Sequence, residues 1–459
     1  MLCLVLMTAG SVHAQDGPPA PGPQAAPRQS SDDIDVENGP DRASVGPSIL
    51  SRDAGLVGQR GGKLIDLRLY GEITGIYDSA LAPVPAANGP VVVVPDHGID
   101  SGAGLIGTRV WRHAQISLEY KGTFRQYARD SLLNGSDQFL DLTYSQFLSP
   151  HAGLDVRAIA GTTTMPNGEF TYLPLANTDF FALPRNDLFN DRKNYAQARI
   201  AFVWQKTRRL SFDIGGEGFL VRRQYMALAG LNGYSARAGV AYRLTEHQTI
   251  GAVVQQTHFD FQRLFGNAEL QTAALEYSIA LSRTLDLAVQ FGGTRLNTSG
   301  LMQVSLDPAV ASIIGQNLAI VTFTHINYVP AAGARLTRRF SHSSLVLEYS
   351  SGVSPGNELY LTSRQTSARA AFSYTGAHRL AAAVSAGYSQ LTALDQTLPL
   401  YGNLEGGGGL TYRISGDTYI ELRYDYRHFT TQNHVYNLDS NRLSLGLAFS
   451  PGAAPLAIW

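Results

Sequence analysis

Apolar and polar residues alternate along most of the chain, and residues 419–427 show the pattern clearly. Alternate positions carry Ile420, Leu422, Tyr424 and Tyr426, and the positions between them carry Glu421, Arg423, Asp425 and Arg427. A period of two residues places the two sets on opposite faces of a β-strand. Such segments of roughly 10 residues, separated by turn residues, are typical of a transmembrane β-barrel, which turns apolar side chains to lipid and polar ones to water.

The same pattern predicts about 18 strands from Asp66 onward. Their centres lie near residues 72, 107, 120, 143, 157, 200, 215, 239, 253, 276, 290, 335, 347, 370, 385, 409, 423 and 446. Short turns, such as residues 244–247, alternate with long loops at 79–101, 165–193 and 299–328. This asymmetry and an even strand number are typical of outer-membrane barrels. We therefore predict an all-β fold, a transmembrane antiparallel up-and-down β-barrel over residues 61–459.

Two segments precede the predicted barrel. Residues 1–14 have the apolar run and the small-residue motif Val12-His13-Ala14 of a secretory signal peptide. The single cysteine, Cys3, lies in this segment, so cleavage would leave an exported chain without thiols. Residues 15–60 are rich in Pro and Gly and lack periodicity, which predicts a disordered periplasmic tail. A partner-binding segment is the alternative interpretation of this tail.

Composition narrows the class of protein further. Hydrophobic residues make up 44% of the chain and charged residues 16%, yet no stretch after the N-terminus offers the roughly 18 apolar residues of a membrane helix. The formal net charge is -1, and there is no basic run of the kind that binds nucleic acid. Nucleic acid is therefore not an expected partner.

Several strand faces can be assigned from the alternation. Ile116, Leu118, Tyr120 and Phe124 are expected to face lipid, and the polar residues between them, including Glu119, Lys121 and Arg125, to face the interior. By the same argument Leu345, Leu347 and Tyr349 oppose Glu348, and Leu443, Leu445, Leu447 and Phe449 oppose Ser444 and Gly446. Tyrosines near strand ends, such as Tyr242 and Tyr412, fit aromatic girdles at the membrane interface.

A barrel of about 18 strands is too wide for side chains to fill, so an aqueous channel is the expected interior. The charged candidates for its lining are Glu119, Lys121, Arg125, Arg157, Arg237, Glu276, Glu348, Arg369, Glu421, Arg423, Asp425 and Arg427, with Asp155, Glu217 and Glu405 as further candidates. Two roles are open for them. Opposite charges can pair across strands and brace the wall, or several charges at one height can select solutes.

Catalytic, metal and cofactor sites find little support in the sequence. No H-E-x-x-H, C-x-x-C or G-x-S-x-G motif occurs at a credible position, and we predict no catalytic residues, metal or cofactor. The run Gly406-Gly407-Gly408-Gly409 lies in a strand pattern without a following helix, so it indicates a bend or a close backbone approach. A Ser/His pair on the outer wall, as in a membrane hydrolase, is the remaining enzymatic alternative.

The segment 299–328 is unusually apolar for a surface loop, with Ile313, Ile314, Leu318, Ile320 and Phe323 close together. Exposure of that much apolar surface is costly. We therefore expect this loop to fold inward as a partial constriction or to pack on the rim. An overlong strand is the alternative, because residues 319–326 also alternate.

The final predicted hairpin resembles a segment of a known group of proteins. Residues 421–427 (ELRYDYR), a polar loop and residues 441–447 (NRLSLGL) are similar to the closing hairpin of Gram-negative outer-membrane porin-like proteins. In particular, the chain resembles the β-barrel porins encoded with exopolysaccharide biosynthesis genes. The resemblance implies an outer-membrane location and a channel role. Phe449 or Trp459 would then present the C-terminal aromatic residue that the barrel-assembly machinery recognises.

From the sequence we predict an outer-membrane channel, not an enzyme, for polysaccharide or small polar solutes. Outer-membrane lipid and the barrel-assembly machinery are the expected partners, and polysaccharide or polysaccharide export proteins are further candidates. A structural or adhesive surface barrel with an occluded lumen is the alternative, and an outer-membrane hydrolase is a third. Cargo, ion selectivity and oligomeric state stay open.

Overall fold

A computed structural model describes residues 66–80, 84–85, 91–92, 95–129, 134–164, 192–224, 229–263, 266–305, 318–354, 362–375, 377, 379–394, 400–415, 417–431 and 437–450. The predicted signal peptide and tail, residues 1–14 and 15–60, lie outside the described residues. No helix in this described part is long and apolar enough to cross a membrane.

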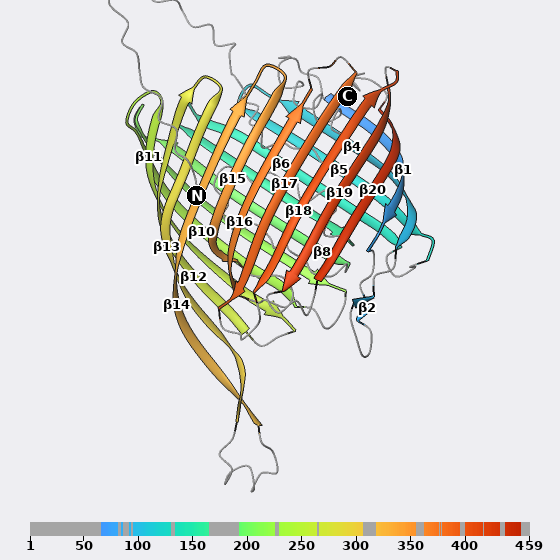
Figure 1. Ribbon diagram of the computed structural model, residues 1–459. Coiled ribbons are helices and arrows are strands. Elements are labelled where there is room, and N and C mark those ends of the chain that lie inside the picture. The colour runs from blue at the N-terminus through green and yellow to red at the C-terminus, as the bar shows by residue number, and fades with distance from the viewer. Residues whose placement is uncertain are drawn as a thin grey trace, which may run out of the picture. The chain divides into compact units, whose positions relative to one another are not determined.

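Eighteen strands form one antiparallel sheet in which chain neighbours pair (Figure 1). The strands are β1 (Asp66–Asp78), β4 (Asp96–Val110), β5 (Ala114–Tyr127), β6 (Gly135–Ser149), β7 (Ala152–Thr163), β8 (Lys193–Gln205), β9 (Leu210–Arg223), β10 (Gly230–Arg243), β11 (Gln248–Gln262), β12 (Gly266–Ser282), β13 (Leu285–Ser305), β14 (Leu318–Arg339), β15 (Ser343–Ser354), β16 (Ser363–Tyr374), β17 (Leu380–Ala393), β18 (Tyr401–Arg413), β19 (Thr418–Thr431) and β20 (Asn437–Phe449). β1 pairs with both β4 and β20, which closes the sheet into a barrel. The predicted fold class is confirmed.

Each of the predicted strand centres falls within one of these strands. The loop predicted at residues 79–101 was too long, because β4 already begins at Asp96. The glycines in residues 98–104 gave this segment the composition of a loop. They are strand residues that leave room for neighbours: a Cβ on Gly104 would lie 2.4 Å from the ring of Tyr70 on β1. The preceding connection contains only the short strands β2 (Val84–Pro85) and β3 (Val91–Val92) among its described residues.

The loop predicted at residues 299–328 was wrong over most of its length. β13 and β14 pair without interruption from Leu285↔Arg338 to Ser305↔Leu318. Residues 306–317 lie outside the described part of the chain. The alternative interpretation, an overlong strand, is therefore the one that holds for residues 299–305 and 318–328. Figure 1 shows this hairpin extending beyond the neighbouring strands of the barrel.

The two faces of the wall differ in chemistry. On β5, Tyr120 and Phe124 are exposed, whereas Lys121 and Arg125 are 3% and 6% exposed and pair with acids on other strands. Side chains converge on the concave face of a barrel, so the face with these long-range ion pairs is the inner face. Leu347, Leu445 and Leu447 lie on the exposed outer face, as predicted.

Candidate functional site

The charged side chains on the inner face of the barrel form a set of ion pairs. At β5, Lys121 Nζ lies 2.8 Å from Glu72 Oε1 on β1. The two strands are not neighbours, because β4 lies between them. Gly102 and Gly104 of β4 are the residues opposite Glu72 and Lys121 in the strand register, so no side chain separates the pair. A close approach across β4 is what these glycines permit.

Arg125 is the centre of a second cluster on the same part of the wall. Its Nε and Nη2 donate to the two carboxylate oxygens of Asp100, each at 2.8 Å, and its Nη1 donates to Asp137 Oδ2 at 3.2 Å. Arg442 Nη2 lies 3.5 Å from Asp100 Oδ2. These bonds join β4, β5, β6 and β20. A planar guanidinium bound by both carboxylate oxygens is a directional contact that braces the wall.

Further pairs continue around the barrel. Arg157 on β7 donates from Nη2 to Asp141 Oδ2 on β6 at 2.6 Å. Arg237 on β10 lies 3.4 Å from Asp213 on β9 and 3.4 Å from Glu276 on β12. Each contact joins different strands, so every cation here also connects elements of the wall.

Five charged residues from β14 to β19 follow one line of the strand register. The order is Arg335, Glu348, Arg369, Gly387, Glu405 and Arg427. Arg335 Nε lies 3.4 Å from Glu348 Oε1, and Arg369 Nη2 lies 2.9 Å from Glu405 Oε1. Charges of both signs therefore alternate along one line of the strand register on the inner face.

Arg427 differs from the other arginines of this line. It is 4% exposed, and its guanidinium stacks over the ring of Phe429 at 4.7 Å. Its Nε and Nη2 have no hydrogen-bond partner among the described residues. On the same strand, Arg423 Nε donates to Asp425 Oδ2 at 2.7 Å. Arg427 is therefore held by packing rather than by a bidentate carboxylate.

The structure places the sequence-predicted charges on the inner face, and all of them except Glu119, Asp155, Glu217, Glu421 and Arg427 take part in the ion pairs above. Bracing is thus observed for most of them, and a role in lining a channel stays a prediction. Several partners were missed: Glu72, Asp100, Asp137, Asp141, Asp213, Arg335 and Arg442. Period-two counting within each strand would have found most of them, whereas Asp100 was hidden in the predicted loop.

The inner face also carries an apolar region that the sequence did not reveal. Phe259, Leu270 and Leu296 lie on β11, β12 and β13, are at most 1% exposed, and belong to one cluster that extends from β6 to β15. They lie toward the end of the barrel from which the β13–β14 hairpin extends. The inner wall is therefore charged over part of its surface and apolar near one end.

Comparisons with known proteins give no family for this chain. No protein-family model matches it. No curated protein matches it either. Among solved structures, it is similar to Pseudomonas aeruginosa OccK5 (OpdH), with 12% identity, a TM-score of 0.42, and coverage of 84% of this chain and 99% of the other. The outer membrane protein OpdK from the same organism is 13% identical, with a TM-score of 0.39, and the match covers 84% of this chain and 99% of OpdK. Acinetobacter baumannii OccAB3 is 11% identical, with a TM-score of 0.40, and the match covers 84% of this chain and 100% of OccAB3.

Proposed function

We propose that this chain is a passive channel of a Gram-negative outer membrane and that it admits small polar solutes. The observation that carries the proposal is the opposite chemistry of the two faces of a closed barrel. Ion pairs occupy the inner face, and exposed Leu, Ile, Val and aromatic side chains occupy the outer face. In water this arrangement would expose a large apolar surface, whereas in a bilayer it satisfies both faces.

The height of the outer apolar band supports a membrane location. On β10 the exposed rings of Tyr234 and Tyr242 stand at the two ends of the outward-facing run Ala236, Ala238 and Val240. The eight residue steps between them span about 27 Å along the strand, which corresponds to a height of about 19–22 Å for a strand tilted by about 35–45°. The apolar band of an outer-membrane barrel is about 25 Å tall. At the same end of the barrel as Tyr242, Trp204 and Phe212 stack on the outer face with ring centroids 5.7 Å apart.

The mixed charge of the inner face supports polar solutes without a strong preference for one sign. Arg335, Glu348, Arg369 and Glu405 compensate one another within one line of the register. Eighteen strands enclose more space than side chains fill. The polysaccharide cargo implied by the sequence resemblance stays a prediction, because these contacts support small polar solutes in general.

A second candidate is a surface barrel with an occluded lumen. The observation that favours it is the apolar inner cluster around Phe259, Leu270 and Leu296, whose near-complete burial indicates that part of the lumen is filled near that end. An occluded barrel would keep the same outer face but pass no solute.

Liposome swelling tests the proposal. The full chain, reconstituted in liposomes, is diluted into isosmotic arabinose, glucose, sucrose or raffinose, and swelling is followed by light scattering. A passive channel gives rates that fall steadily as the sugar grows, with heat-denatured protein as the control. Absence of swelling with every sugar would overturn the channel and support the occluded barrel. Equal rates for raffinose and arabinose would indicate a pore wide enough for polysaccharide.

A further inference from the structure

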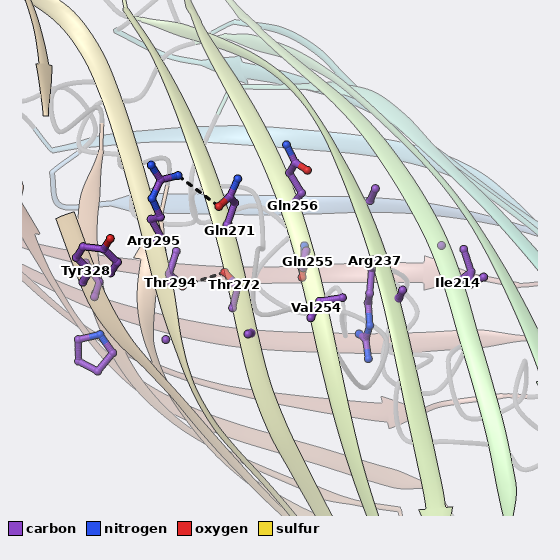
Figure 2. Close-up of a pocket in the computed structure, with 17 residues that line it drawn as sticks. Ile214, Arg237, Val254, Gln255, Gln256, Gln271, Thr272, Thr294, Arg295 and Tyr328 are labelled. Atoms are coloured by element: carbon purple, nitrogen blue, oxygen red, sulfur yellow. Dashed lines mark hydrogen bonds between the residues drawn. The ribbon is translucent and has the colours of Figure 1, made fainter. Parts of the chain in front are cut away.

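A hollow lies in the outer wall between β9 and β14, with a volume of about 1060 Å³ (Figure 2). Its floor is made by the small outward residues Ala236, Ala238, Ala273 and Gly293. These small residues lie on β10, β12 and β13, and the exposed side chains of Ile214 on β9 and Val254 on β11 flank them.

The hollow lies where the outer face changes from apolar to polar. One transverse line of the register contains Ala238, Val254, Ala273, Gly293 and Pro330, which are all apolar. The next line toward the long connections contains Ala236, Gln256, Gln271, Arg295 and Tyr328. Figure 2 shows Gln256, Gln271 and Arg295 together at one end of the hollow.

Arg295 is the only charged residue in these two lines. Its Nη1 donates to Gln271 Oε1 at 3.3 Å, which fixes the guanidinium at the upper edge of the hollow. The acidic residues Glu269 and Asp260 lie further from the apolar band, and His258 stands near both, at 4.0 Å and 3.2 Å. The hollow therefore offers an apolar floor with a single cation at its polar end.

We propose that this hollow, named here the β9–β14 hollow, binds an anionic membrane lipid, with an acyl chain on the small-residue floor and the phosphate on Arg295. The inference rests on the proposed membrane location. A cation at the boundary of the apolar band stands at the height of lipid phosphates, and a basic side chain there favours anionic headgroups. The acyl chain would fill space that Leu or Phe fills elsewhere on the wall.

A site-specific quenching experiment tests this assignment. The only cysteine of the chain lies within the predicted signal peptide, so Leu275→Cys introduces a unique thiol next to the hollow for a bimane label. The labelled protein is reconstituted in phosphatidylcholine, and quenching by brominated phosphatidylglycerol is compared with quenching by brominated phosphatidylcholine. We expect the anionic lipid to bind about fivefold more tightly at this position.

Two pairs of variants make the result specific. Arg295→Gln should abolish the preference for the anionic lipid, whereas Arg222→Gln, on the outer face of β9, should preserve it. Gly293→Leu should weaken quenching by both lipids, because the leucine side chain fills the floor of the hollow. The strand has room for this side chain, because a Cβ on Gly293 meets only Val329 O at 4.0 Å. Ala386→Leu on the outer face of β17 is its control.

A preference that survives Arg295→Gln, or that Arg222→Gln lowers equally, would overturn the proposal. Liposome swelling is measured on the same preparations, so a barrel that inserts and conducts but shows no lipid preference refutes the lipid site alone. A barrel that binds the lipid but does not conduct refutes the channel alone.

Discussion

Arg369 on β16 and Glu405 on β18 form an ion pair of 2.9 Å although β17 lies between their strands. The residue opposite both in the register is Gly387, and a Cβ there would lie 2.8 Å from Glu405 Oε1. The pair therefore exists because β17 presents no side chain at this height. Lys121 and Glu72 meet across the glycines of β4 in the same way.

A side chain at Gly387 should separate this ion pair. We expect Gly387→Val to lower the free energy of unfolding by about 1–3 kcal/mol, because the added carbons must displace Glu405. Urea unfolding in lipid vesicles, followed by tryptophan fluorescence, measures the change. Gly406→Val is the matched control, because a Cβ on Gly406 meets only Ser385 O at 3.8 Å on the outer face. Equal destabilisation by the two substitutions would contradict the bridging role of Gly387.

The two faces of β20 give a second prediction. Leu445 is 58% exposed on the outer face, so Leu445→Arg should cost about 2–4 kcal/mol if it faces the bilayer interior. Ser444 faces inward opposite Arg423, with Glu421 and Asp425 diagonal to it on β19. Ser444→Arg should therefore cost much less. The same urea titration compares them, and an equal loss of stability at both positions would show that the outer face is not in lipid.

Much of the fold followed from period-two alternation, because a wall with lipid on one side and water on the other imposes that pattern on every strand. The outward positions of Leu347, Tyr120 and Leu445 followed in the same way. The alternation does not report where a strand ends, however. It continues through residues 319–326, and only the pairing of β14 with β13 shows that they extend a hairpin.

The inner face was harder to predict for a different reason. The charges Arg369 and Glu405 were identified, but their contact depends on the register of three strands and on a glycine in the middle one. Neither is encoded locally in the sequence. Asp100 was missed because its glycine-rich surroundings, which the wall needs for close packing at Tyr70 and Glu72, have the composition of a loop.

The extended β13–β14 hairpin should not control conductance. Its pairing continues to Ser305↔Leu318, and it reaches beyond the neighbouring strands (Figure 1). Replacing residues 302–321 by Asn-Gly would close the hairpin at the Leu301↔Thr322 pair with a favourable two-residue turn. We expect the shortened protein to fold and to keep its single-channel conductance. An increase in conductance would show that the removed segment, including residues 306–317, constricts the lumen.

The line of charges on the inner face predicts how selectivity responds to mutation. Arg335, Arg369 and Arg427 stand against Glu348 and Glu405, so the wild-type line is nearly balanced. Glu405→Gln preserves the shape of the side chain and removes one negative charge, which leaves three cations against one acid. We expect the reversal potential in a KCl gradient to move toward the chloride equilibrium potential, because anions gain a favourable site in the lumen.

A matched removal of charge on the outer face makes this last test specific to the lumen. Asp439 lies on the outer face of β20, where Tyr426 Oη donates to it at 2.7 Å and His428 lies 2.9 Å away. Asp439→Asn changes the net charge by the same amount without adding a cation to the inner face, so its reversal potential should match the wild type. A shift of equal size in both variants would mean that overall charge, not the inner line, sets selectivity. No shift with Glu405→Gln would mean that ions pass the barrel away from Arg369, or do not pass it at all.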